Sequence, residues 1–121
     1  MFEVTVTKIF SAAHKLIEVG GACENLHGHN FTVEVTISSE KLTAEGIVID
    51  FREVKKHLNE VIGYLDHKCL NEIPEFAGMN PSSENIARFI HERLSRKINR
   101  EKLATAKVTI WESDDARVSY S

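Results

Sequence analysis

The sequence predicts an α+β fold in which two helices cover one face of an antiparallel four-stranded sheet. Apolar and polar residues alternate near both ends of the chain, as they do in half-buried strands, and apolar residues recur at helical spacing in two segments between. The 121 residues contain no repeat, no low-complexity tract and only two prolines, so nothing marks a linker. We therefore expect one domain, residues 1–121, with its strands segregated from its helices.

Two strands are predicted in the first third of the chain. The first has an apolar face made of Phe2, Val4, Val6, Phe10 and Ala12. His14 continues the parity of that face. The second spans residues 31–38, with an apolar face made of Phe31, Val33, Val35 and Ile37. His27 and His29 precede this second strand in the same register.

Two helices are predicted in the middle of the chain. The first starts at Asp50, which with Glu53 resembles a capping box. Its apolar stripe consists of Phe51, Val54, Leu58, Val61, Ile62 and Leu65. The second has a stripe of Ile86, Phe89, Ile90, Leu94 and Ile98. Three residues before it could serve as its N-cap: Asn80, Ser82 or Ser83.

The C-terminal region predicts a hairpin. Ala106, Val108 and Ile110 share one face, a turn follows around residues 114–115, and a strand returns through Val118 and Tyr120. An open antiparallel sheet of four strands exposes unpaired backbone groups at both edges. Association between subunits is one way to pair them, so we expect a homo-oligomer.

Composition and charge exclude several classes of function. The net charge is −3 and no dense cluster of Lys and Arg occurs, so nucleic acid is not expected as a partner. No stretch approaches the roughly 20 apolar residues of a membrane helix, and the first residues do not resemble a secretory signal. We therefore expect a soluble cytoplasmic protein, in which Cys23 and Cys69 are free thiols.

The first candidate site is a set of three histidines. Residues two apart in an extended segment point to the same side, so His27 and His29 can reach one metal ion while His14 supplies a third imidazole. Three nitrogen ligands leave a fourth position open, which is typical of a catalytic zinc site. A chain with six histidines also produces an H-x-H pair by chance, so that pair alone is equally compatible with structural or surface histidines.

Cys23 lies four residues before His27. A nearby metal ion can lower the pKa of a thiol and make it a general base or nucleophile near neutral pH. The thiol could equally be a fourth zinc ligand. Cys69, with apolar neighbours, favours a packing role.

Two further positions carry candidate acid–base or binding groups. Asp66 and His67 follow the first helix, and as sequence neighbours they can act together only if the chain leaves helical geometry near Leu65. Such a pair is more often solvated than catalytic. Glu112 ends an apolar strand face, where an unpaired carboxylate is costly, so a ligand with N–H donors would satisfy it.

Together these segments resemble the family of 6-pyruvoyltetrahydropterin and 6-carboxytetrahydropterin synthases over nearly the whole chain. The matching segments, in order, are Phe10 to His14, Cys23 to His29, Ile49 to Phe51, Leu65 to His67, Asn80 to Asn85, and Glu112. The resemblance implies the tunnelling fold, with subunits joined into a β-barrel and two trimers stacked as a homohexamer. It implies zinc (Zn²⁺) bound by His14, His27 and His29. Implied catalytic residues are Cys23, Asp66 and His67, and implied substrate-binding residues are Glu112, Ser83 and Glu84.

The spacing of Cys23 resembles one branch of that family. Three residues separate it from His27, as in 6-carboxytetrahydropterin synthases, whereas the pyruvoyl enzymes have five. This branch implies conversion of 7,8-dihydroneopterin triphosphate to 6-carboxy-5,6,7,8-tetrahydropterin, acetaldehyde and triphosphate in 7-deazaguanine and queuosine biosynthesis. Two alternatives are a 6-pyruvoyltetrahydropterin synthase on the same scaffold and a non-catalytic protein that binds pterin or zinc.

Overall fold

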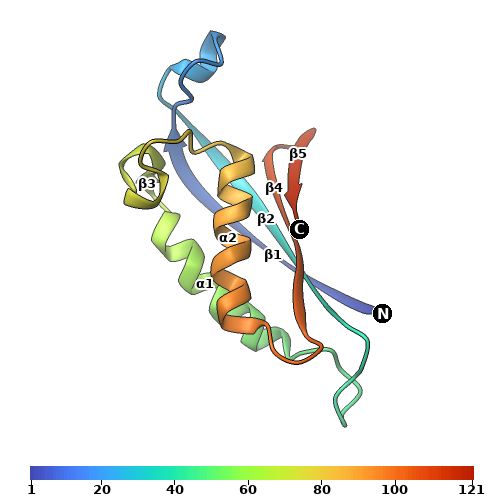
Figure 1. Ribbon diagram of the computed structural model, residues 1–121. Helices are drawn as coiled ribbons and strands as arrows, with labels where there is room; N and C mark the ends of the chain where they lie inside the picture. Colours follow the sequence, from blue (N-terminus) through green and yellow to red (C-terminus); the bar gives the residue numbers. More distant parts are fainter.

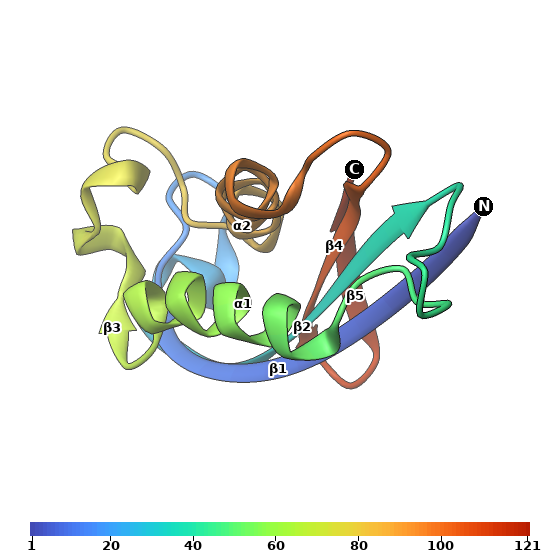
Figure 2. The same ribbon diagram turned by 90° about the horizontal axis from the view of Figure 1, so that it is seen from below.

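The computed structural model describes residues 1–121. The chain forms a curved sheet backed by two helices (Figure 1). Seen from below, α1 and α2 both lie on the concave face of the sheet (Figure 2). The regular elements are β1 (Phe2–His14), β2 (His27–Ser39), α1 (Phe51–Leu65), β3 (Lys68–Cys69), α2 (Ser83–Ile98), β4 (Ala104–Ser113) and β5 (Ala116–Tyr120). Short 3₁₀ turns are η1 (Gly21–Glu24), η2 (Leu70–Glu72) and η3 (Pro74–Phe76).

The sheet has five strands in the order β3-β1-β2-β4-β5, so the prediction of four antiparallel strands was incomplete. Four strands are antiparallel neighbours, but β3 runs parallel to β1 and pairs with Ala12 and Ala13. The sheet is therefore mixed. A strand of two residues is too short to show an alternating pattern, so β3 could not be predicted from the sequence.

The register between β1 and β2 positions the candidate ligands. These strands pair without a shift from Phe2 opposite Ser39 to His14 opposite His27. His29 lies opposite Ala12, two residues from His14 on the same face of the sheet. Two separate sequence segments thus bring their histidines to one end of the sheet.

A single cluster of apolar side chains fills the space between the sheet and the helices. Phe10 and Phe31 stack at its centre with ring centroids 5.1 Å apart. Phe51, which was assigned to the stripe of α1, is instead 51% exposed, because it lies in the first turn of the helix beside a surface pocket. Ala106 is only half-buried, because a register shift opposite Thr36 turns Thr105 into the core instead.

Both helices begin at side-chain caps. The Asp50 carboxylate accepts a hydrogen bond from the Arg52 amide at 2.8 Å. Glu53 does not complete a capping box, because its carboxylate binds Arg100 at 2.9 Å. Of the three candidate caps for α2, Ser82 is the one used, and its hydroxyl accepts from the Asn85 amide.

Two edges of the sheet remain open. On its outer side β1 pairs only at Ala12 and Ala13, and β5 has β4 as its only neighbour. Long runs of backbone donors and acceptors are therefore available for pairing.

Neither α1 nor α2 combines the length and the apolarity that crossing a membrane requires.

Candidate functional site

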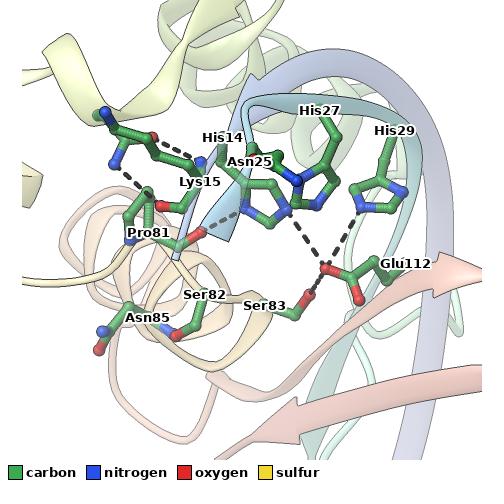
Figure 3. A network of polar contacts seen from close by, with 11 residues as sticks. His14, Lys15, Asn25, His27, His29, Pro81, Ser82, Ser83, Asn85 and Glu112 are labelled. Carbon is green, nitrogen blue, oxygen red and sulfur yellow. Dashed lines mark hydrogen bonds and ion pairs between the residues drawn. The ribbon is translucent and has the colours of Figure 1, made fainter. Parts of the chain in front are cut away.

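Three imidazoles meet at the end of β1 and the start of β2 (Figure 3). The ring centroids of His14 and His27 are 4.6 Å apart, those of His27 and His29 are 4.8 Å apart, and those of His14 and His29 are 5.2 Å apart. One nitrogen from each ring lies within 4.8 Å of the other two. The three predicted ligands therefore form one cluster that can hold a metal ion.

Backbone carbonyls fix two of these rings. His14 Nδ1 donates to the Pro81 carbonyl at 2.8 Å, and His27 Nδ1 donates to the Asn25 carbonyl at 2.7 Å. Because a carbonyl only accepts, each neutral ring keeps its lone pair on Nε2. Metal-binding histidines are oriented in this way by a hydrogen bond from their other nitrogen.

His14 provides the strongest sign of a cation-binding site. Its side chain is fully buried and its Nε2 has no hydrogen-bond partner. Glu112 Oε1 lies 3.5 Å away, too far for a good hydrogen bond. A buried polar atom without a partner is costly, so the donor set fits a bound cation such as zinc.

The pKa of His29 lies below its ordinary value. Partial burial is the main cause, the charge of Glu112 opposes it, and the neighbouring His14 and His27 lower the pKa further. A lowered pKa favours the neutral imidazole at neutral pH, and only the neutral ring can donate a lone pair to a metal ion.

Glu112 reaches the cluster from the end of β4. Its Oε1 is 3.7 Å from His29 Nε2 and accepts a hydrogen bond from the Ser83 hydroxyl at 3.2 Å. Ser83, Glu84 and Glu112, all predicted to bind substrate, line one small cavity of about 130 Å³ together with Arg117. The carboxylate is thus directed toward the histidines from an adjoining cavity.

Cys23 lies on the exposed turn η1, in the connection between β1 and β2. Its carbonyl accepts a hydrogen bond from the Leu16 amide at 2.7 Å. The thiol is not among the ligand atoms that gather at the three histidines. The structure of this chain therefore does not bring the Cys23 thiol into the histidine cluster.

Asp66 and His67 form a pair where α1 ends. The helix stops at Leu65, and His67 adopts a left-handed conformation with φ of 58°, so the chain leaves helical geometry as the pairing requires. Asp66 Oδ1 then lies 3.0 Å from His67 Nδ1. The Ser11 amide also donates to Asp66 Oδ1 at 2.9 Å, and this bond is the main reason that the pKa of Asp66 is lowered.

The Asp66–His67 pair makes no polar contact with the three histidines of its own chain. It is anchored to the outer edge of β1 through Ser11, and no hydrogen bond or ion pair connects it to the three histidines. His67 lines a pocket of about 520 Å³ whose lining also includes His29, Asn30 and Cys69. Among the predicted residues, Glu112 contacts the three histidines, Asp66 and His67 form a separate pair, and Cys23 is joined to neither.

Several contributors to the site were not predicted. The carbonyls of Asn25 and Pro81 orient the ligands, but a backbone group leaves no residue-specific signal in a sequence. Ser11 and Asn30 are hydrogen-bonded to each other at 2.6 Å. They occupy the polar parity of their strands, which sequence analysis treats as solvated.

Comparison with known proteins identifies the class. Residues 3–121 match the family model described as 6-pyruvoyl tetrahydropterin synthase, so the chain belongs to that family, whose members are lyases that act on pterins. A protein of Archaeoglobus fulgidus, provisionally named 6-carboxy-5,6,7,8-tetrahydropterin synthase, is 39% identical over 93% of this chain and 89% of its own.

Two further relatives carry other names. The dihydroneopterin monophosphate aldolase of Pyrococcus furiosus is 36% identical over 88% of this chain and 85% of its own. The structure of Caenorhabditis elegans 6-pyruvoyl tetrahydropterin synthase superimposes with a TM-score of 0.84 at 30% identity, over 99% of this chain and 96% of that one. One fold and family thus include proteins named for three reactions on pterins.

Proposed function

We propose that this chain is a zinc-dependent 6-carboxy-5,6,7,8-tetrahydropterin synthase. It converts 7,8-dihydroneopterin triphosphate and water to 6-carboxy-5,6,7,8-tetrahydropterin, acetaldehyde and triphosphate, in 7-deazaguanine and queuosine biosynthesis in the cytoplasm. The observation that carries the proposal is the buried His14 Nε2, which lacks a hydrogen-bond partner inside a cluster of three histidines and lies 3.5 Å from Glu112, a residue that lines the adjoining cavity. The branch is supported by the three-residue spacing between Cys23 and His27 and by the name of the Archaeoglobus relative.

The metal site supplies one part of the chemistry. His14, His27 and His29 would hold the zinc ion, which when bound would supply a Lewis acid for oxygen atoms of the substrate's side chain. The chain's own contribution is to hold three neutral imidazoles in place through the Pro81 and Asn25 carbonyls.

Other residues bind the substrate and move protons. Glu112 accepts hydrogen bonds from the amino and ring N–H groups of the pterin, and the Ser83 hydroxyl fixes its carboxylate. Glu84 lines the same cavity. Cys23 removes a proton from a side-chain carbon as general base, which requires the thiolate form. His67, oriented by Asp66, exchanges a proton with the substrate.

The lack of a hydrogen bond or ion pair between the Asp66–His67 pair and the histidine cluster of the same chain supports an active site made by more than one subunit. The open edges of β1 and β5 provide the means, because pairing between subunits would close the sheets into a barrel. We propose a homohexamer in which two such barrels stack. Each active site then takes its zinc ligands and its Asp66–His67 pair from different chains.

A second candidate function is aldol cleavage of a dihydroneopterin phosphate, favoured by the 36% identity to the Pyrococcus aldolase. A pyruvoyl-forming lyase is the third, favoured by the likeness to the Caenorhabditis structure. A non-catalytic protein that binds pterin or zinc is the fourth, and it has no need of Cys23 together with Asp66 and His67.

Product identification separates these functions. The zinc-loaded protein is incubated with 7,8-dihydroneopterin triphosphate or monophosphate, and the products are identified by mass spectrometry. We expect acetaldehyde, triphosphate and 6-carboxytetrahydropterin from the triphosphate. Triphosphate without acetaldehyde would indicate the pyruvoyl reaction, and a phosphorylated two-carbon fragment would indicate the aldolase. A bound but unchanged pterin would leave only the binding function.

A further inference from the structure

Beyond His14 the chain continues in the direction of β1, and two asparagine side chains occupy the place of a neighbouring strand. Asn71 Oδ1 accepts from the Lys15 amide at 2.9 Å, and its Nδ2 donates to the Lys15 carbonyl at 3.0 Å. Asn80 does the same for Ile17, at 2.7 Å and 3.0 Å. Each amide group therefore binds both backbone groups of one residue, and we call these four hydrogen bonds the asparagine clamp.

The spacing of the clamp matches the geometry of a strand edge. In an extended segment, residues two apart direct their N–H and C=O groups to the same side. β3 covers this side at Ala12 and Ala13, and then the chain turns into η2. At the next positions along the same edge, the side chains of Asn71 and Asn80 bind the backbone groups of Lys15 and Ile17. A primary amide offers a donor and an acceptor side by side, whereas Ala has neither and an ionised Asp only accepts, so neither residue can reproduce both contacts.

The opposite side of the clamped segment holds the connection that carries Cys23. The Leu16 amide, which points away from the clamp, donates to the Cys23 carbonyl at 2.7 Å. The Glu18 amide donates to the Glu24 carboxylate at 2.9 Å. The connection between β1 and β2 extends beyond the ends of the helices, so its base is the part attached to the body of the protein (Figure 1).

Asn80 is itself held by the start of α2. The Asn85 side chain donates to the Asn80 carbonyl at 2.8 Å, and the Asn85 amide is bound by the Ser82 cap. The residue after Asn80 is Pro81, whose carbonyl orients His14. Residues 80–81 thus fix both His14, a proposed metal ligand, and Ile17, at the base of the connection that carries Cys23.

We propose that Asn71 and Asn80 are positioning residues that hold residues 15–17 as an extension of β1 and thereby place Cys23 for proton transfer beside the His14 cluster. The evidence for the asparagine clamp is its four hydrogen bonds, which do not depend on the proposed function. Its effect on catalysis rests on the proposed role of Cys23. The asparagines touch neither metal nor substrate, so their effect must appear in the order of residues 15–26 and in turnover.

The test compares amide hydrogen exchange and kinetics in four variants. Asn71→Ala and Asn80→Ala remove the clamp at one residue each. Asn80→Asp keeps an acceptor for the Ile17 amide but places an oxygen against the Ile17 carbonyl. Asn59→Ala is the control, because Asn59 is exposed on α1 and outside the site. Exchange is followed by mass spectrometry on peptides that cover residues 15–18, with peptides of α2 as internal reference.

We expect exchange at residues 15–18 to accelerate roughly tenfold in Asn71→Ala and Asn80→Ala, because each variant loses two hydrogen bonds from a locally opening segment. Exchange should also accelerate in Asn80→Asp, which loses one hydrogen bond and places a carboxylate oxygen against the Ile17 carbonyl. Exchange in α2 should not change. The kcat should fall on the order of tenfold to a hundredfold, as expected for a misplaced catalytic group, at unchanged zinc content and KM. Asn59→Ala should behave as wild type in both measurements.

Each contrary outcome has a definite meaning. Unchanged exchange at residues 15–18 overturns the clamp, and faster exchange with undiminished kcat overturns its positioning role. Loss of zinc in step with kcat also overturns the assignment, because the amides would then act through His14. If Asn80→Ala does not fold, Asn71→Ala and Asn80→Asp decide the same points. A wild-type protein without turnover would refute the proposed function and the positioning role together, whereas exchange would still establish or refute the clamp.

Discussion

His14 shows how a single residue can reveal a site. An imidazole that is fully buried must satisfy both nitrogens, and here one of them binds the Pro81 carbonyl while the other has no partner. A bound metal ion accounts for that cost, and the adjoining His27 and His29 supply the rest of a three-nitrogen donor set.

The roles proposed for Cys23 and Glu112 can be separated by mutation. Cys23→Ala should keep zinc and still bind a pterin, but kcat should fall by about 10² to 10⁴ for a lost general base. Glu112→Gln should keep zinc and chiefly weaken pterin binding, because the anionic partner of the ring is gone. Steady-state kinetics, pterin titration and metal analysis distinguish the two. Near wild-type turnover of Cys23→Ala would end the general-base assignment.

Asp66 predicts a specific pH dependence of stability. The Ser11 amide and His67 lower its pKa in the folded protein below the ordinary 3.8, so the unfolded chain takes up a proton first as the pH falls. The stabilisation is therefore fully present above about pH 4 and is lost as the pH falls through the folded-state pKa. Urea unfolding from pH 7 to pH 3 should show a smaller acid-induced loss in Asp66→Asn than in wild type.

The control for that measurement is Asp114→Asn, which removes a carboxylate from the exposed hairpin turn. This variant should keep the acid-induced loss of the wild type. An Asp66→Asn variant as sensitive to acid as wild type would show that the contacts of Asp66 are not maintained in solution.

At the scale of elements, the cap of α2 has consequences for the site, because Ser82 lies between Pro81 and Ser83. Ser82→Ala should lower the free energy of unfolding by about 1 kcal/mol, the usual cost of removing an N-cap side chain. Ser95→Ala is a matched control on the same helix, because the Ser95 hydroxyl is buried without a hydrogen-bond partner. It should cost nothing or stabilise. Equal losses in both variants, measured by urea unfolding, would contradict the capping assignment.

Most elements were predictable because their periodicity is clear, and the exceptions have physical reasons. β1, β2 and both helices show long apolar patterns, and the structure has them at the expected places. The short β3 has no pattern to show, and the half-buried Ala106 results from a bulge that a strict alternation does not reveal. Phe51 matched the helical period but lies beyond the end of the core.

The site was predictable to a similar extent. The three histidines are recognisable from their parity and spacing, and the structure brings them together. The asparagine clamp was not predictable, because it joins side chains to backbone groups of residues 56 and 63 positions away. Nothing in the local sequence of Asn71 or Asn80 indicates such partners.

At the scale of the whole molecule, the open edges and an apolar surface predict association. Phe2, Ile47 and Phe51 are each about half exposed around a pocket of about 460 Å³ beside the first residues of β1. Exposed apolar patches of this kind mark interaction surfaces. Light scattering should give a particle of six chains, or at least three, each of 13.7 kDa. A monomer that retained full activity would refute an active site made by several subunits.

The central claim is that three histidines hold a zinc ion with a position left open, and X-ray absorption at the zinc edge of the purified protein tests it most directly. We predict about one zinc per chain, with only nitrogen and oxygen neighbours at about 2.0–2.1 Å, and loss of this signal in His27→Ala. A sulfur neighbour at about 2.3 Å would make Cys23 a fourth ligand and the site a closed structural one. That result, or full zinc occupancy in His27→Ala, would contradict the account.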